Sequence, residues 1–441
     1  MAATPEKRLA RDNTLKQLVT AVNGVREAIQ GQASVIYAFH IDGNEADPSA
    51  AVTYKNDAVG MVPAYMDYGA GKFNYGSWGN AFFMPRPCML KSDGTVDYYL
   101  NENDYTKKID GVTASDVANT SYDGNAMMEW GRDGKRIYYK VVPDVGDNYS
   151  GTVYIADGKV DEDYQCYSFI NNQGDLVDHF YTPIYNGSVI STKMRSLSGQ
   201  ALSKSLTATQ EKTAAQANNP GTDLLWNIEC MADRILINFL LVLMGKSLDT
   251  QSVFGQGATT SGTEAINDTY VTGVHDAKGL FFGTNSGTVA ANTFGNCVKV
   301  FGMENYWGLQ WRRTNGWIMV DGDQRLKLTN GTEDGSTANG YNEDGAGYIS
   351  LGATPTGTSG GYIEKSKFAR YGILPQDATG DSTHNYCDGL YFNNSGQRFA
   401  HVGGYSFSGA LCGAFCASLS AAASGAHWAH GAAISCKPLA A

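Results

Sequence analysis

The sequence is short of the residues that mark disulfide-stabilised, nucleic-acid-binding and membrane-spanning proteins. Its 441 residues include 8 cysteines, too few for a disulfide scaffold in a chain of this length. The net charge is −11, whereas a nucleic-acid footprint needs a basic patch. The longest apolar run, residues 235–244, is about half of a membrane span and contains Asn238. We therefore expect no disulfide framework, no nucleic-acid partner and no membrane insertion.

The first 33 residues lack the apolar core of a secretory signal peptide, because polar and charged residues alternate there. Thr4 and Pro5 are typical of an N-cap and a first helical position, so we expect a helix over residues 4–30. Its apolar residues follow steps of three and four, a heptad seam made of Leu15, Leu18, Val22, Val25 and Ile29. The helix is either amphipathic and packed on its own domain, or a short coiled coil that supports a homotrimer or attachment to a larger assembly.

The composition favours loop-rich β structure held together by aromatic residues, since the chain has 52 Gly and 26 Tyr but 11 Pro. Strands are expected at residues 34–40, 51–54, 95–100 and 136–142. The first three define a small β domain at residues 34–111.

Two helices are expected further along the chain. Residues 199–218 are polar, whereas residues 223–244 are apolar on several faces and end at Gly245, a suitable C-cap. A helix this apolar must be buried.

The C-terminal stretch differs sharply in composition from the rest of the chain. Residues 405–436 contain no Asp, Glu, Lys or Arg, although 17% of the chain is charged. Alternation predicts one packed face with Phe415, Ala417, Leu419 and Ala421, and an opposite face of small residues with Cys416, Ser418 and Ser420. This stretch is either a core or a surface selected for something other than solubility.

The residue types of this stretch are restricted as well. Apart from Trp428, every residue from 405 to 436 is of a type that a codon ending in a pyrimidine can encode. The spacing GG-x-x-x-x-G-x-x-C-G-x-F at residues 403–415 resembles the variable region of proteins diversified by diversity-generating retroelements. Many members carry Trp two residues after the glycine pair, where this sequence has Ser406.

The resemblance implies an α+β fold of the C-type-lectin-like type, related to formylglycine-generating enzymes, in which two helices pack on an irregular antiparallel sheet. It would span residues 112–441, with a variable ligand-binding region at about 398–436. The rigid framework would be Gly403, Gly404, Gly409, Cys412, Gly413, Phe415, Leu419, Trp428 and Gly431. The varied, ligand-binding residues would be Tyr405, Phe407, Ser408, Leu411, Cys416, Ser418, Ser420, Ala421, Gly425, His427, Ala429 and His430. Their aromatic and imidazole members would be the anchors.

Residues 87–105, PCMLKSDGTVDYYLNENDY, resemble a segment of phage tail-associated proteins. Together the two resemblances imply a hypervariable receptor-binding protein, an adhesin of the phage tail tip within the virion. It would recognise a bacterial surface protein or glycan, contact other virion tail proteins and carry out no catalysis. The alternatives are a formylglycine-generating-enzyme-like oxidoreductase and a purely structural virion protein.

The sequence has no P-loop, no H-E-x-x-H zinc motif and no C-x-x-C pair. Two groups of possible metal ligands have simpler interpretations. The cysteines and histidines of the C-terminal stretch fit codon randomisation, and the acidic residues at 321–323 and 343–345 fit solvated turns rather than calcium ligands. We therefore predict no catalytic residue, no metal and no cofactor.

Overall fold

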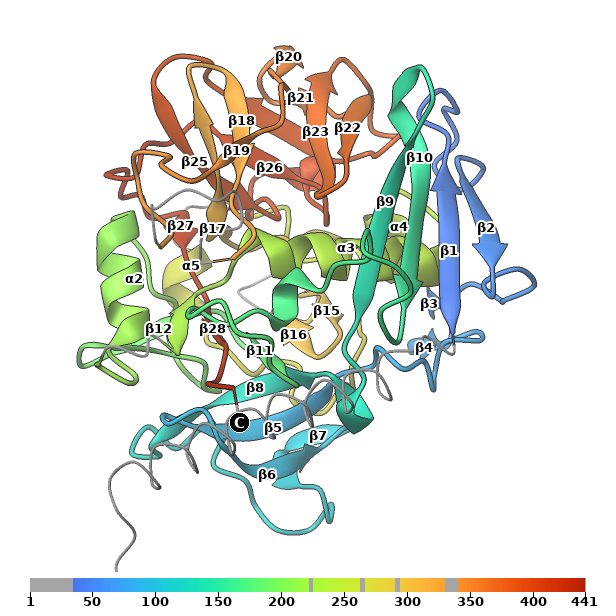
Figure 1. Cartoon of the computed structure of the whole chain (residues 1–441). Coiled ribbons are helices and arrows are strands. Elements are labelled where there is room, and N and C mark those ends of the chain that lie inside the picture. The colour runs from blue at the N-terminus through green and yellow to red at the C-terminus, as the bar shows by residue number, and fades with distance from the viewer. Residues whose placement is uncertain (1–34, 222–224, 262–265, 290–293, 330–339, 441) are drawn as a thin grey trace, which may run out of the picture.

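The computed structural model describes residues 35–221, 225–261, 266–289, 294–329 and 340–440 (Figure 1). The helix expected at residues 4–30, with its heptad seam, lies outside the described residues.

The described chain is mainly β, with 36% strand and 10% helix. The expectation of an α+β fold of the C-type-lectin-like type is therefore wrong. Most of the strands belong to several separate antiparallel sheets rather than to one irregular sheet covered by two helices. Residues 199–207 and 225–230 were expected to lie in the helices, but they form loops and a strand at Trp226–Ile228. This strand pairs with Ile434–Cys436, and the pairing buries its apolar side chains in the core.

The largest sheet in the lower part of Figure 1 has the order β14-β28-β11-β8-β5-β6-β7. Its strands are β5 (Arg86–Lys91), β6 (Val96–Asn101), β7 (Asp104–Lys108), β8 (Gly124–Trp130), β11 (Phe180–Pro183), β14 (Trp226–Ile228) and β28 (Ile434–Cys436). All side chains of β8 are buried, because neighbouring strands flank it and the rest of the fold covers its faces.

A second sheet stands at the right of Figure 1, in the order β2-β1-β10-β9. Its strands are β1 (Ile36–Ile41), β2 (Val52–Asn56), β9 (Tyr138–Asp144) and β10 (Asp147–Ala156). In both sheets, strands from before and after residue 112 pair directly, β1 with β10 and β5 with β8. The expected small β domain at residues 34–111 thus shares its sheets with the part that follows.

The third large sheet occupies the upper part of the molecule and has the order β19-β18-β17-β25-β26-β24-β21, with β27 pairing parallel to β17. Its strands are β17 (Trp311–Val320), β18 (Asp323–Leu326), β19 (Ile349–Ser350), β21 (Gly361–Tyr362), β24 (Gly389–Phe392), β25 (Gln397–Val402), β26 (Ala417–Leu419) and β27 (His430–Gly431). It positions the C-terminal stretch.

Short sheets and helical turns connect these layers. The short strands are β3 (Tyr65–Asp67), β4 (Lys72–Asn74), β12 (Ser188–Ile190), β13 (Lys193–Arg195), β15 (Lys299–Val300), β16 (Met303–Glu304), β20 (Thr356–Gly357), β22 (Lys365–Ala369) and β23 (Gly372–Ala378). The short helices are α4 (Thr250–Phe254), α5 (Ile266–Thr269), and the 3₁₀ turns η1 (Arg132–Gly134), η2 (Tyr167–Phe169) and η3 (Gly409–Leu411).

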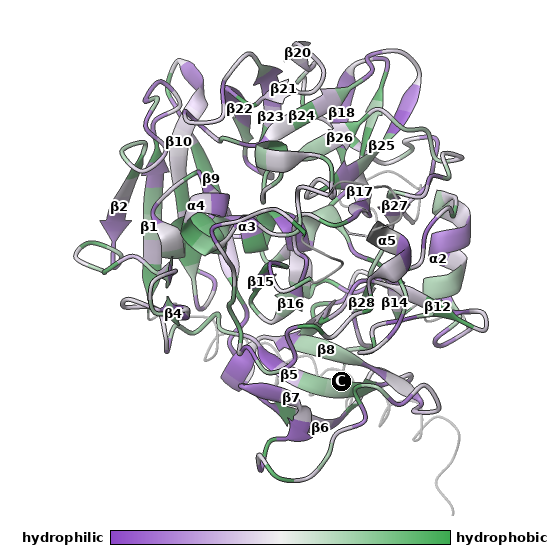
Figure 2. Cartoon of the chain, turned by 180° about the vertical axis from the view of Figure 1, so that it is seen from behind, coloured by the Kyte–Doolittle hydropathy of each residue, from purple (hydrophilic) through white to green (hydrophobic). Residues whose placement is uncertain are grey.

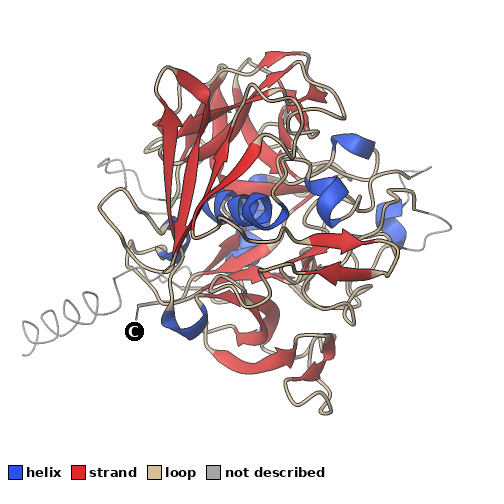
Figure 3. Ribbon diagram, turned by 90° about the vertical axis from the view of Figure 1, so that its right-hand side faces the viewer, coloured by secondary structure: helices blue, strands red, loops and turns tan. Residues whose placement is uncertain are grey.

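Helix α3 (Met231–Gly245) crosses the middle of the molecule between the upper and lower sheets, and Figure 3 shows it nearly end-on. It is hydrophobic in Figure 2, and every side chain from Met231 to Met244 is buried. The sequence prediction of a buried helix is confirmed, although Lys246, in the left-handed conformation, caps it instead of Gly245. The side-chain amide of Asn238 in this helix donates a hydrogen bond to the carbonyl oxygen of Ala414 at 2.8 Å. This bond connects the core helix to the C-terminal stretch.

Helix α2 (Ala208–Gln216) is shorter than the expected 199–218. Its N-cap is Thr207, whose hydroxyl accepts a hydrogen bond from the backbone N–H of Gln210. The Gln210 side chain in turn accepts one from the backbone N–H of Thr207, which completes a capping box. Before it, Gly199 and Ser205 have positive φ, which is incompatible with a continuous helix.

Candidate functional site

The C-terminal stretch belongs to two of the three large sheets. After β25 the chain turns at Gly403 and Gly404, passes through η3 and enters the upper sheet as β26, between β25 and β24. It then returns to β17 as β27 and descends into the lower sheet as β28, the red path in Figure 1. Strands on both sides thus fix the backbone of this stretch.

The turn that contains Gly404, and the chain at Gly413 just after η3, have no room for a side chain at these two positions. Gly404 has φ +78°, and a Cβ there would lie 2.4 Å from the Sγ of Cys412. Gly413 has φ +148°, and its missing side chain leaves room for the carboxylate of Asp388, which accepts a hydrogen bond from the backbone N–H of Phe415 at 2.7 Å. Both positions therefore require glycine in this fold.

We expect Gly404→Ala to lower the free energy of unfolding by at least about 2 kcal/mol, because the new methyl group combines a strained φ with a clash. Gly409→Ala is the matched control, since Gly409 has φ +56° but no atom lies within 4 Å of its Cβ position. Urea denaturation of both variants measures the difference. Equal losses of stability would show that the contact with Cys412 is unimportant.

The loop that follows the glycine pair is held by hydrogen bonds to distant segments. The backbone N–H of Ser406 donates a hydrogen bond to the carbonyl oxygen of Leu309, and that of Gly409 donates one to the carbonyl oxygen of Thr259. Within the loop, the N–H of Tyr405 donates to the Oγ of Ser408 at 3.3 Å. The bonds of Ser406 and Gly409 join main chain to main chain and do not depend on which side chains the loop carries, whereas the bond of Tyr405 needs the Ser408 hydroxyl.

Aromatic side chains from this loop and from the segment before β27 form one continuous cluster. The rings of Tyr405, Phe407 and Trp428 form a triangle, with the centroid of Tyr405 5.9 Å from each of the other two and those of Phe407 and Trp428 6.0 Å apart. His427 extends the cluster, 5.3 Å from Trp428. Phe407 is 43% exposed and His427 is exposed, so the cluster opens to solvent. We call Tyr405, Phe407, His427, Trp428 and His430 the aromatic face.

Two residues outside the C-terminal stretch support the aromatic face. Trp311 of β17 stacks on Tyr405 at 6.0 Å and 25°, and Tyr391 of β24 packs edge-on against Trp311 at 5.6 Å. The binding residues expected from the sequence included neither Trp311 nor Tyr391, although Trp311 is buried directly against Tyr405. The one available signal was the set of aromatic residues near strand ends, which gives no indication that Trp311 and Tyr391 come into contact in the folded chain.

The structure divides the expected binding residues into two groups. Exposed or half-buried are Tyr405, Phe407, Leu411, Ser418, Ser420, Ala421, Gly425, His427 and His430. Ser408, Cys416 and Ala429 are buried, with exposed fractions of 5%, 0% and 2%. Cys416 and Ala429 pack with Trp311, so these two support the aromatic face from below. Trp428, expected as framework, is half-buried within that face.

The loop between β26 and β27 rests on a buried ion pair. Arg313 of β17 binds Glu211 of α2, with 2.6 Å between Nε and Oε2, and neither side chain is more than 1% exposed. Arg313 also donates from Nη2 to the carbonyl oxygen of Gly425 at 2.8 Å. Burial raises the pKa of Glu211 to about 7 although the charge of Arg313 opposes the rise. Helix α2 is thereby linked to the loop that carries His427.

No family model matches the sequence, and no curated protein does. The arrangement of side chains is therefore the basis for any functional assignment. Among the helices that the structure describes, none is long and apolar enough to cross a membrane.

Three histidines line up from the aromatic face into the interior. His427 and His430 are 5.2 Å apart, and His430 lies 4.2 Å from the fully buried His401 of β25. Burial lowers the pKa of His430 to about 4, and the charge of Arg313 acts in the same direction. The same two causes hold the pKa of His401 well below its ordinary value. Both buried rings are therefore neutral at neutral pH.

We expect His401→Leu to reduce the sensitivity of the protein to acid. The unfolded chain binds a proton on His401 near pH 6.5, whereas the folded chain does not, so the wild type is at full stability above that pH. Below it, the wild type should lose up to about 1.4 kcal/mol per pH unit relative to the variant. Urea denaturation between about pH 5 and pH 8 measures this difference. A difference that stays constant with pH would contradict the assignment.

The cysteines do not have the surroundings of reactive thiols. All eight are unpaired and buried. Burial raises the pKa of both Cys412 and Cys416, whereas a redox-active or metal-binding cysteine needs a stabilised thiolate. Within the described residues, no group of three or more His, Cys, Asp or Glu side chains is arranged to hold a metal ion.

The acidic residues considered as calcium ligands have partners within the chain. Asp321 accepts a hydrogen bond from the N–H of Gly396 at 2.8 Å, and Asp323 pairs with Arg325 at 2.8 Å. Glu343 accepts a hydrogen bond from Thr209 at 2.7 Å. The contacts of Asp321 and Glu343 join segments that are far apart in the sequence.

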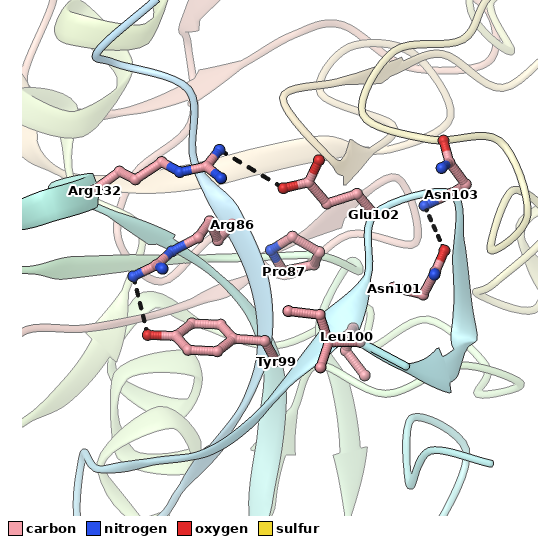
Figure 4. A pocket seen from close by; sticks show the side chains of 9 residues that line it. Arg86, Pro87, Tyr99, Leu100, Asn101, Glu102, Asn103 and Arg132 are labelled. Carbon is pink, nitrogen blue, oxygen red and sulfur yellow. Dashed lines mark hydrogen bonds and ion pairs between the residues drawn. The ribbon is translucent and has the colours of Figure 1, made fainter. Parts of the chain in front are cut away.

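A cavity of about 330 Å³ lies apart from the aromatic face, between β5, β6 and η1. Figure 4 shows Arg132 reaching Glu102 across the cavity, 3.7 Å away, and Arg86 donating to the hydroxyl of Tyr99 at 3.0 Å. Arg86 is also paired with the buried Glu129 at 2.7 Å. The charges around this cavity are thus balanced within the chain.

Proposed function

We propose that this protein is a non-catalytic, hypervariable adhesin of a phage tail, which attaches the virion to a bacterial surface protein or glycan through the aromatic face. The resemblance of residues 87–105 to phage tail-associated proteins supports the location, and the restricted residue types of residues 405–436 support diversification. The observation that carries the proposal is the aromatic face itself. It combines exposed rings with a backbone fixed by two sheets.

A diversified binding site has two structural requirements. The backbone must keep its shape when side chains change, and the changed side chains must reach solvent. The main-chain hydrogen bonds of Ser406 and Gly409 meet the first requirement, and the exposure of Phe407 and His427 meets the second. Aromatic rings that are already packed together lose little conformational freedom on binding, so they suit the role of anchors.

The affinity of one such face should be modest, because it is small and carries no charge. Several copies acting together would raise the avidity without new contacts. The heptad seam expected in residues 15–29 would supply a means of forming a homotrimer, and attachment to other tail proteins would supply further copies. The proposal therefore includes oligomeric display.

Deep sequencing of this gene across a population that carries it tests the proposal. We expect changes to concentrate at the exposed and half-buried members Tyr405, Phe407, Leu411, Ser418, Ser420, His427 and His430. Gly413, Phe415 and Trp428 should stay constant, and the buried Cys416 and Ala429 should vary less than their exposed neighbours. The upstream residues 35–221 serve as the internal control. Even variation along the chain, or a constant C-terminal stretch, would overturn the proposal.

A further inference from the structure

A surface cavity beside β9 has no lining residue in common with the aromatic face. It has a volume of about 550 Å³, within the range of small-molecule sites, which is roughly 300–1,000 Å³. One wall is Val141, Val142 and Pro143 of β9. The opposite side is the turn between β22 and β23, with Arg370 and Tyr371.

Two tyrosines give this cavity an aromatic surface. The rings of Tyr167 and Tyr371 both line it, with centroids 6.5 Å apart and planes at 52°. The carbonyl oxygen of Tyr371 accepts a hydrogen bond from the buried Tyr139 at 2.9 Å, which fixes the turn against the core. The guanidinium of Arg370 lies 4.5 Å from the centre of the Tyr371 ring. The position of the aromatic surface is therefore set by the fold rather than by a free loop.

Hydrogen-bonding groups of both kinds surround the rings. The lining includes two cations, Lys140 and Arg370, and two carboxylates, Glu162 and Asp163, so its charges balance. Lys140 is already held by Asp163 at 2.8 Å and by Asp161 at 3.2 Å. An anionic ligand would have to compete with these carboxylates, and a cationic ligand would meet Lys140 and Arg370. The balance favours a neutral ligand that both donates and accepts hydrogen bonds.

We propose that this cavity is a saccharide-binding site, separate from the aromatic face and the same in every version of the protein. A sugar ring presents an apolar face of C–H groups to the half-buried Tyr371, beside the largely buried Tyr167, while its hydroxyls donate to carboxylates and accept from Lys140 and Arg370. Residues 405–436 contain none of these charged types, so the cavity offers contacts that the diversified stretch does not. The saccharide site itself does not rest on the proposed function; only its being the same in every version of the protein does.

Titration of the full chain with glucose, galactose, mannose, N-acetylglucosamine, lactose and maltose tests this site, with ligand-observed NMR and calorimetry as readouts. We expect at least one of these sugars to bind. Tyr371→Ala should weaken that binding by about tenfold or more, and Tyr371→Phe, which keeps the ring, by no more than about threefold. Tyr65→Ala is the matched control, because Tyr65 is a half-exposed tyrosine of β3, outside the cavity.

The outcomes separate this site from the aromatic face. Trp428→Ala should leave the binding of these sugars unchanged even if it abolishes attachment to cells. If none of the six sugars binds at concentrations up to roughly 20 mM, the inference is overturned. It is equally overturned if binding survives Tyr371→Ala but is lost in Trp428→Ala, since the sugar would then occupy the aromatic face.

Discussion

Arg313→Met is expected to lower the free energy of unfolding by about 3–5 kcal/mol, because it leaves the carboxylate of Glu211 buried without its partner. The expected loss is large since both side chains are almost completely buried and the pair bridges α2 and β17. The variant also loses the hydrogen bond to the carbonyl oxygen of Gly425, so the loop with His427 should become more accessible to protease. Urea denaturation and limited proteolysis measure the two effects.

The double variant Arg313→Met with Glu211→Leu is the control for this prediction. Removing both charges should restore most of the lost stability, because no unpaired charge then remains in the core. The pH dependence gives a second check. Glu211 has a pKa raised to about 7 in the folded protein, and the loss of Arg313 should raise it further, so the deficit of the single variant should grow as the pH rises above about 7 and stay constant below it, where the carboxyl is protonated in both folded proteins. A deficit that is independent of pH and persists in the double variant would contradict the role assigned to the pair.

Phe407→Ala is expected to weaken attachment to cells that the parental protein binds by roughly 30-fold, about 2 kcal/mol, while stability changes by no more than about 0.5 kcal/mol. Phe407 is an exposed member of the aromatic face, in contact with Tyr405 and Trp428. Its removal therefore reduces the apolar area that the ligand can contact, but removes little packing from the core. Retention of the purified protein on such cells measures binding, and thermal unfolding measures stability.

Val145→Ala is the matched control for Phe407→Ala, since Val145 is fully exposed in the turn between β9 and β10. It should change neither binding nor stability. If both variants bind like the parent, the aromatic face is not the attachment site. If Phe407→Ala instead blocks incorporation into virions, the stretch has an assembly role, as a structural virion protein would require.

Local sequence signals predicted several strands well. The strands expected at residues 34–40, 51–54, 95–100 and 136–142 correspond to β1, β2, β6 and β9. Alternating polarity and β-branched or aromatic residues are local signals, so they identify these strands without knowledge of the strands that pair with them. The buried helix α3 was equally clear, because its apolar residues cover every side and leave no solvent-facing stripe.

The errors arose where distant pairing overrides local preference. Trp226 and Ile228 were expected to begin a helix, but they form β14, because Cys436 and Ile434 pair with them from the other end of the chain. The same effect produced the wrong fold class. A sequence gives no information on such a partner without knowledge of the topology.

The candidate site was partly predictable for a related reason. In β26, Ala417 and Leu419 are buried and Ser418 is half-buried, as the alternation indicated. Cys416 and Ala429 were expected at the surface, but they lie beneath it against Trp311. Composition marked the stretch as unusual, whereas only the pairing of β27 with β17 decides which of its residues point outward.

The position of β28 has a consequence for how the protein folds. β28 lies between the edge strand β14 and β11, so β14 is joined to the rest of the lower sheet by a strand that the ribosome makes long after both neighbours. Until residues 434–436 emerge, β14 and β11 each present an unpaired edge, and such edges promote aggregation. Closing the sheet requires contacts between residues far apart in the sequence, which slows folding. We expect the nascent chain to remain incomplete, and in need of protection by chaperones, until this strand has been synthesised.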